Sequence, residues 1–217
     1  MEKNCKYILW DLDGTLTDPM IGITTCVQYA LRHLGIEVKD LQELCPFIGP
    51  PLVESFSTFY GFSPEQARQA VGRYREYFSR QGIFENELYP GIKELLEDLK
   101  KHGVRILLAS SKPEVYARKI LEHFQLLPFF DFVAAATMDD TRSKKTDVVR
   151  YALETCGISP DRAVMIGDRH HDIDGAKDNA LESIGVLWGY GSREELSAAG
   201  ATRLAESVPQ LASLLGL

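Results

Sequence analysis

Five short, continuously apolar runs constrain the fold of this chain more than any other feature of its sequence. Most of them end in a polar or acidic residue, and they cover 7–13, 104–111, 132–137, 162–168 and 183–188. Runs of this kind are typical of strands that are buried on both faces of a parallel sheet. Amphipathic helical patterns at 113–124 and 146–156 alternate with the later runs. The alternation predicts an α/β fold, a doubly wound (Rossmann-like) parallel sheet that binds ligands at the carboxyl ends of its strands.

The first crossover is far longer than one helix requires. No further strand-like run follows the first one for about 70 residues, and helical patterns cover 20–34, about 51–60 and 64–81 instead. The last of these opens with an N-cap serine, a proline and a capping-box glutamine, which are helix-start signals. We therefore expect two domains. Residues 1–16 plus 87–217 form the α/β core, and residues 17–86 form an inserted all-helical cap that lies over the strand ends as a lid.

Charge and cysteine usage exclude several classes of protein. The formal net charge of −7 over 217 residues argues against nucleic acid or an anionic membrane as a partner. No run approaches the 18 apolar residues of a membrane span, and charged residues near the start argue against a signal peptide. The scattered cysteines suit neither a zinc site nor a disulfide framework, and they are Cys5, Cys26, Cys45 and Cys156. We expect a cytoplasmic protein.

Acidic residues follow two of the predicted strands. Asp11 and Asp13 close the first strand, and Asp168 closes the fourth, with Asp172 four residues further on. Because the first, second and fourth strands are natural neighbours in a doubly wound sheet, these carboxylates are expected to meet in one crevice. Two carboxylates about 4 Å apart repel by roughly 1 to 4 kcal/mol, so the group requires a cation or raised pKa values. An oxygen-only ligand set favours a hard ion, and Mg²⁺ above all where phosphate also binds.

The same residues suit phosphoryl transfer. A carboxylate at Asp11 can attack phosphorus and form an aspartyl-phosphate. Asp13 can protonate the leaving oxygen and later take a proton from the hydrolytic water. Gly14 allows the backbone to turn at once, and a hydroxyl at Ser110 with an ammonium at Lys145 would complete a cradle for the transferring group.

Four stretches together resemble the motifs of the haloacid dehalogenase superfamily. They are DLDGT at 11–15, the serines that close LLASS, a lysine before the helix at 146, and GDRHHD at 167–172. Within that superfamily the chain is most similar to the phosphatase branch, and especially to phosphoglycolate phosphatases, in which stretches like FIGPPL and GVLWGYGS also occur. The resemblance implies a helical cap in the position of 17–86, Asp11 as nucleophile and Asp13 as general acid/base. It also implies phosphoryl ligands and Mg²⁺ ligands: for phosphate Ser110, Ser111 and Lys145, and for Mg²⁺ Asp11, the backbone carbonyl of Asp13, Asp168 and Asp172.

The sequence alone does not decide which lysine is the motif lysine, nor what Lys112 does. Lys144 and Lys145 are adjacent, and the proline that often follows the motif lysine is Thr146 here. We favour Lys145 because Lys-x-Asp-Val-Val leads directly into the helical stripe. Lys112 either adds positive charge near the site or begins a helix before Pro113.

Other polar residues near the motifs have structural interpretations. His170 and His171 are expected to be exposed loop residues, and Asp18 and Asp174 to be capping or solvated acids. Trp10, before the expected nucleophile, is interpreted as a packing residue. The arginines of the cap helix are expected on a solvated face, and they are Arg73, Arg75 and Arg80.

The function predicted from these features is hydrolysis of a small phosphomonoester, phosphoglycolate-like or a nucleotide, by a Mg²⁺-dependent phosphatase with an aspartyl-phosphate intermediate. One alternative is a phosphomutase of the same fold, similar to β-phosphoglucomutase, which passes the phosphoryl group to a sugar. Another is a non-catalytic module that binds metal or phosphate. A dehalogenase is disfavoured, because that chemistry does not need a general acid at position 13. The sequence does not indicate an oligomeric state.

Overall fold

The computed structural model describes residues 6–139 and 141–217, so the prediction for Cys5 lies outside the described residues. The contacts between residues divide the chain into two compact units, Met1–Thr17 with Leu88–Leu217, and Asp18–Glu87. We call the first the core unit and the second the inserted unit. The two segments that connect them, β2 (Thr17–Asp18) and β3 (Glu87–Leu88), pair with each other as a two-stranded sheet.

A six-stranded sheet forms the centre of the core unit, in the order β5-β4-β1-β6-β7-β8. Its strands are β1 (Tyr7–Trp10), β4 (Arg105–Pro113), β5 (Phe132–Ala136), β6 (Ala163–Gly167), β7 (Glu182–Val186) and β8 (Arg203–Ala205). All neighbouring pairs are parallel, and Trp10 of β1 lies level with Leu108 of β4 and Ile166 of β6. The segments that follow these three strands therefore emerge at the same edge of the sheet.

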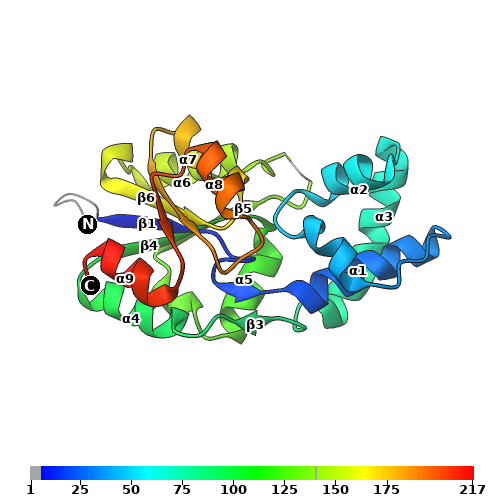
Figure 1. Cartoon of the computed structure of the whole chain (residues 1–217), viewed down its shortest axis with the longest axis horizontal. Coiled ribbons are helices and arrows are strands. Elements are labelled where there is room, and N and C mark those ends of the chain that lie inside the picture. Colours follow the sequence, from blue (N-terminus) through cyan, green and yellow to red (C-terminus); the bar gives the residue numbers. More distant parts are fainter. Residues whose placement is uncertain (1–5, 140) are drawn as a thin grey trace. The chain divides into compact units, whose positions relative to one another are not determined.

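Helices cover both faces of this sheet (Figure 1). On one face lie α6 (Lys145–Cys156), α7 (His170–Asp178) and α8 (Arg193–Ala199). On the other lie α4 (Ile92–Lys101), α5 (Glu114–His123) and α9 (Val208–Leu215). The predicted α/β class with a doubly wound parallel sheet is thereby confirmed.

Apolar side chains from the strands and from α6 form the interior of the core unit. Leu9, Met165 and Val148 are fully buried there, as is Trp10, in keeping with its predicted packing role. The apolar runs of the sequence are continuous because the strands that they form are covered on both sides. Among the described residues, none of the helices combines the length and apolarity needed to span a bilayer.

The inserted unit is helical. It contains α1 (Met20–His33), a 3₁₀ segment (Leu41–Phe47), α2 (Leu52–Tyr60), α3 (Pro64–Tyr77) and a π-helical turn (Phe78–Gly82). The capping box that opens α3 is formed: Gln66 N donates to Ser63 Oγ, and Ser63 N donates to the Gln66 side chain. The helix predicted over 64–81 is α-helical as far as Tyr77 and continues as the π-helical turn from Phe78.

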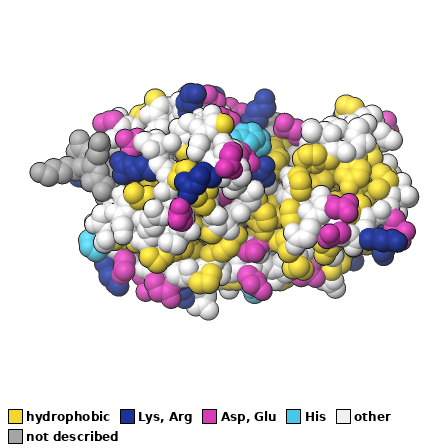
Figure 2. All heavy atoms as spheres, viewed as in Figure 1, with side chains coloured by type: hydrophobic (Ala, Val, Ile, Leu, Met, Phe, Trp, Pro, Cys, Tyr) yellow, Lys and Arg dark blue, Asp and Glu magenta, His cyan; other side chains and the backbone are white. Residues whose placement is uncertain are grey.

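The surface of the inserted unit carries several exposed apolar side chains. Ile21, Phe59 and Phe84 are each about half exposed. Figure 2 shows hydrophobic side chains gathered on the visible face of this unit, with acidic and basic side chains at its margins. Arg73, which was expected on a solvated face, forms an exposed ion pair with Glu76 at 3.0 Å.

Candidate active site

A tight turn follows β1 and places the first pair of acids. Asp11 N continues the sheet by donating to Ile166 O at 2.9 Å, and the carbonyl of Leu12 then accepts from three successive backbone amides, Thr15, Leu16 and Thr17. Gly14 has φ +83°, a conformation that favours glycine. A Cβ at Gly14 would lie 2.2 Å from Asp168 Oδ2, so glycine also permits the close approach of this turn to the end of β6.

Three of the predicted metal-binding carboxylates meet at this edge of the sheet. Asp11, Asp168 and Asp172 are all buried, and each offers an oxygen within 4.8 Å of the others. Asp11 follows β1 and Asp168 follows β6, while Asp172 lies in the first turn of α7. The alignment of β1 with β6 thus brings together residues that are more than 150 positions apart in sequence.

Lys145 lies among these carboxylates. Its Nζ is 2.7 Å from Asp11 Oδ1 and 2.8 Å from Asp172 Oδ1, and it donates to the Ala109 carbonyl of β4 at 2.8 Å. Lys144 is exposed immediately before α6, where it is the N-cap residue. Of the two adjacent lysines, Lys145 is therefore the one that the structure brings into the acidic cluster.

The carboxylates of the cluster repel one another despite the ammonium of Lys145. Burial, and then repulsion by Asp172 and Asp11, raise the pKa of Asp168 well above its usual value. Burial, opposed by the attraction of Lys145, raises the pKa of Asp172 to about 6. Burial alone would lower the pKa of Lys145, but the neighbouring Asp11 and Asp172 raise it. A buried set of carboxylate oxygens that repel one another in this way fits a hard divalent cation.

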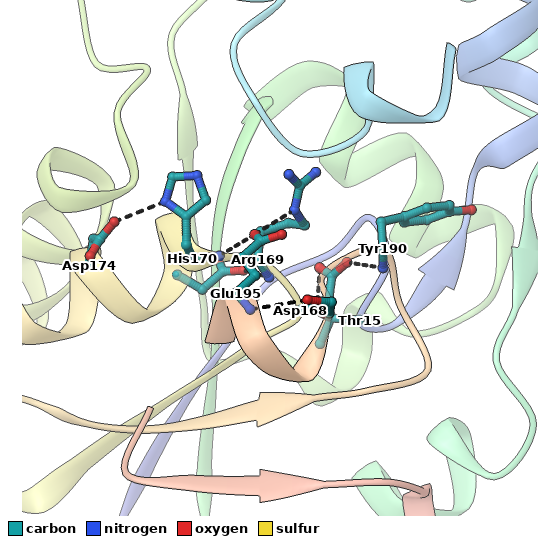
Figure 3. Close-up of polar contacts among 9 residues, drawn as sticks. Thr15, Asp168, Arg169, His170, Asp174, Tyr190 and Glu195 are labelled. Carbon is teal, nitrogen blue, oxygen red and sulfur yellow. Dashed lines mark hydrogen bonds and ion pairs between the residues drawn. The ribbon is translucent and has the colours of Figure 1, made fainter. Parts of the chain in front are cut away.

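Contacts from two distant loops hold Asp168 (Figure 3). Thr15 Oγ1 donates to Asp168 Oδ1 at 3.3 Å, and Tyr190 N donates to Asp168 Oδ2 at 2.7 Å. Trp188 Nε1 donates to the Thr15 carbonyl at 3.1 Å and links the two loops. A Cβ at Gly189 would lie 2.3 Å from the Gly14 carbonyl, so this loop can approach only through glycine. GVLWGYGS was noted for its resemblance alone, and its contacts with Asp168 were not predicted.

A second set of contacts holds the segment between Asp168 and Asp172. Glu195 Oε1, from α8, accepts from Arg169 Nε and from His170 N, both at 2.9 Å (Figure 3). Asp172 Oδ2 accepts from Arg169 N at 3.1 Å. Glu195 was not singled out in the sequence, where it lies outside the four motifs in an ordinary exposed-helix pattern.

The prediction that His170 and His171 are exposed loop residues is wrong. Both lie in the first turn of α7, because the helix begins two residues after Asp168. His170 Nδ1 is 3.0 Å from Asp174 Oδ2, one helical turn away. His171 is half-buried. Burial, together with repulsion from the positive charges of His170 and Arg169, lowers the pKa of His171 to about 4.

The fourth predicted acid, Asp13, has different surroundings. Its side chain is buried, and Oδ2 pairs with the Nζ of Lys112, which is itself buried. Oδ1 of Asp13 is buried without a hydrogen-bond partner among the described residues. Burial raises the pKa of Asp13 despite the attraction of Lys112. Lys112 belongs to β4, and α5 begins only at Glu114, so the structure favours site charge over a helix start for this lysine.

The two predicted serines differ in their burial. Ser110 is buried in the second half of β4, next to Ala109, whose carbonyl accepts from Lys145. Its Oγ accepts from Lys112 N at 3.3 Å. Ser111 is half-buried, in an irregular part of the strand. Ser110 therefore contacts Lys112 directly and adjoins the residue that binds Lys145, whereas Ser111 is the more exposed of the two serines.

Comparisons with known proteins identify relatives over nearly the whole chain. A family model described as haloacid dehalogenase-like hydrolase matches residues 8–186. A 5′-nucleotidase from Pseudomonas aeruginosa is 44% identical over 208 residues, which are 96% of this chain and 94% of that protein. The tyrosine-protein kinase PtkA from Mycobacterium tuberculosis is 38% identical over 214 residues, 98% of this chain and 73% of that protein. The crystal structure of a predicted phosphatase from Clostridium acetobutylicum matches with a TM-score of 0.97 and 47% identity, over 99% of this chain and 100% of that one.

Proposed function

This chain belongs to the haloacid dehalogenase-like hydrolases, as its four motifs predicted, and from that premise we propose that it is a phosphatase for a small phosphomonoester. The observation that carries the proposal is the convergence of Asp11, Asp168 and Asp172, with the ammonium of Lys145 in contact with Asp11 and Asp172. Three carboxylates and one buried cation at the carboxyl ends of parallel strands suit the binding of an anion together with a metal ion.

The first step is an attack by Asp11. A carboxylate oxygen of Asp11 forms a bond to phosphorus while the bond from phosphorus to the ester oxygen breaks. Asp13 gives its carboxyl proton to the departing oxygen, so that an alcohol leaves and Asp13 becomes a carboxylate. Lys145, with its Nζ 2.7 Å from Asp11, offsets negative charge beside the reacting phosphoryl group, and Ser110 is the proposed hydroxyl donor to it.

The second step hydrolyses the aspartyl-phosphate. The Asp13 carboxylate takes a proton from water as the water oxygen attacks phosphorus, and the bond to Asp11 breaks to release inorganic phosphate. Asp11 is regenerated as a carboxylate and Asp13 as an acid, so the cycle closes. Asp11, Asp168, Asp172 and the backbone carbonyl of Asp13 would hold Mg²⁺, which supplies positive charge to the cluster and to the phosphate.

For the substrate we place nucleoside 5′-monophosphates first. The support is the 44% identity with a protein named 5′-nucleotidase over nearly the whole of both chains. The sequence resemblance to phosphoglycolate phosphatases places phosphoglycolate second. Because a relative 38% identical is named a tyrosine-protein kinase, phosphotyrosine belongs in the same panel of test compounds.

The test is phosphate release from this panel, with and without Mg²⁺, for the native chain, Asp11→Asn and Asp98→Asn. Asp98 is an exposed acid of α4 and serves as the matched control. We expect Mg²⁺-dependent release that is lost in Asp11→Asn and kept in Asp98→Asn. Interconversion of sugar phosphate isomers without phosphate release would point to the mutase. Binding of metal with neither reaction would point to the non-catalytic module.

A further inference from the structure

We propose that Lys112 is a positioning residue for Asp13: it engages one carboxylate oxygen and so restricts the exchangeable proton to the other. The inference rests on the proposed function, in which Asp13 is the general acid/base. It assigns a role to a lysine that lies outside the four motifs and gives each oxygen of Asp13 a separate task.

The shape of β4 explains how Lys112 reaches Asp13. Ser110 pairs with Ala135 of β5, and the next paired residue of β4 is Pro113, with Ala136. Two residues of β4, Ser111 and Lys112, thus fall between consecutive partners, as in a bulge. Irregularities of this kind redirect side chains and are frequent beside active sites. Lys112 N donates to Ser110 Oγ at 3.3 Å, which fixes the backbone at this point.

Burial makes the pairing consequential. The Lys112 and Asp13 side chains are 6% and 9% exposed, and the ammonium contacts Oδ2 of the carboxylate. An ammonium carries donors and no acceptor, so Oδ2 must accept and cannot present a proton to Lys112. When Asp13 is in its acid form, the proton therefore resides on Oδ1.

Oδ1 is the atom that remains available for chemistry. It is buried and has no hydrogen-bond partner among the described residues. An unpartnered buried oxygen is costly unless a ligand completes it. A leaving oxygen that accepts the Oδ1 proton in the first step, and a water that donates to Oδ1 in the second, would both satisfy it.

The two buried lysines thus serve different carboxylates. Lys145 lies between Asp11 and Asp172, whereas Lys112 pairs with Asp13. Loss of Lys112 would let the Asp13 carboxyl rotate and carry its proton on either oxygen. The cost should fall on proton transfer and spare the attack by Asp11.

Leaving-group dependence separates these steps. The leaving group of p-nitrophenyl phosphate departs as a stable phenolate and gains little from a general acid. The leaving group of an alkyl phosphate is a poor one and needs a proton from the acid. We would measure kcat and KM for both esters in the native chain, Lys112→Met, Lys112→Arg, Asp13→Asn and the double variant Lys112→Met/Asp13→Asn. Lys119→Met, an exposed lysine of α5, is the matched control. Thermal melting identifies variants that do not fold.

For Asp13→Asn we expect kcat/KM, which reports the step that releases the alcohol, to fall on the alkyl ester by on the order of 10²-fold or more relative to the aryl ester, the usual worth of a general acid. Lys112→Met should show the same selectivity at roughly 10-fold, with KM little changed and with partial recovery in Lys112→Arg. The double variant should be no worse than Asp13→Asn, because both residues act through one proton.

Other results overturn the inference. An equal loss on both esters with a raised KM would make Lys112 a direct phosphate ligand. Additive losses in the double variant would separate Lys112 from Asp13. If Lys112→Met does not fold, a folded Lys112→Arg with a small loss confined to the alkyl ester would support the pairing, whereas no loss, or equal losses on both esters, would contradict it. A native chain that releases phosphate neither from these esters nor from the panel of substrates named above would refute the proposed function itself, and the inference with it.

Discussion

Replacing Lys145 with methionine removes a buried cation that neutralises two carboxylates at once. Its Nζ lies 2.7 Å from Asp11 and 2.8 Å from Asp172. At an effective dielectric constant of about 20, each contact represents roughly 6 kcal/mol of gross attraction, most of which the desolvation of the three charges offsets. Removal of one member of a buried pair typically destabilises by about 3 to 5 kcal/mol. We expect a deficit of that size at pH 7 in metal-free protein.

The deficit should depend on pH with a definite sign. Asp172 already has a pKa of about 6 beside Lys145, above its usual 3.8, and loss of the lysine raises it further. A carboxyl whose pKa is higher in the folded state favours folding at low pH, and that contribution is lost as the pH rises through the interval between the two values. Between pH 7 and the native value near 6 only the variant carries the proton, and below it both chains do, so one proton over about one pH unit should shrink the deficit by about 1.4 kcal/mol at pH 5.

Urea unfolding in the presence of a chelator, at pH 5 and pH 7, measures both values. Lys144→Met is the matched control, because Lys144 is the exposed neighbour of Lys145. Mg²⁺ should restore more stability to Lys145→Met than to the native chain, since its carboxylates lack their ammonium. Equal losses in the two lysine variants, or a deficit for Lys145→Met that does not change between pH 5 and pH 7, would refute the reasoning.

Two further changes test how the cluster is held. Gly14→Ala should destabilise the fold by about 2 kcal/mol or more and abolish Mg²⁺-dependent activity, since a Cβ there meets Asp168 Oδ2 at 2.2 Å. Gly103→Ala is the control, because Gly103 has φ +73° with open space around it and so tests backbone strain alone. Equal effects of the two substitutions would contradict this prediction. Glu195→Gln should weaken Mg²⁺ binding, measured by calorimetry, on the order of 10-fold because its ion pair with Arg169 at 2.9 Å is lost. The exposed Glu194→Gln should bind Mg²⁺ as the native chain does, and an unchanged affinity in Glu195→Gln would separate Glu195 from the metal site.

The sheet and the acidic cluster were predictable because both depend on strand ends. The run over 162–168 became β6 with Asp168 directly after it, and parallel pairing placed Asp11 beside that end. β8, in contrast, has three residues at the edge of the sheet and is half-buried, so it leaves too short an apolar run to recognise.

The parts that were missed depend on contacts between distant segments. The pairing of Lys112 with Asp13 requires the register shift between Ser110 and Pro113, and nothing in the local sequence specifies where β4 and β5 lose their alignment. The start of α7 was hidden for a related reason. Arg169, before its first turn, is not a residue type that signals an N-cap, and Asp172 supplies the helix-start contact from inside the helix.

The contact of Tyr190 with Asp168 has a consequence for synthesis of the chain on the ribosome. Asp11 emerges long before Asp168, which obtains its backbone donor only when Tyr190 has left the exit tunnel, and Trp188 then joins Thr15 across 173 positions. A nascent chain that stops short of this loop can form β1 and α6 but lacks the contacts that fix the acidic cluster. The contacts that fix Asp168 and the turn after β1 therefore form only after the loop of Trp188 and Tyr190 has been made, and a chain that stalls before this loop would lack them.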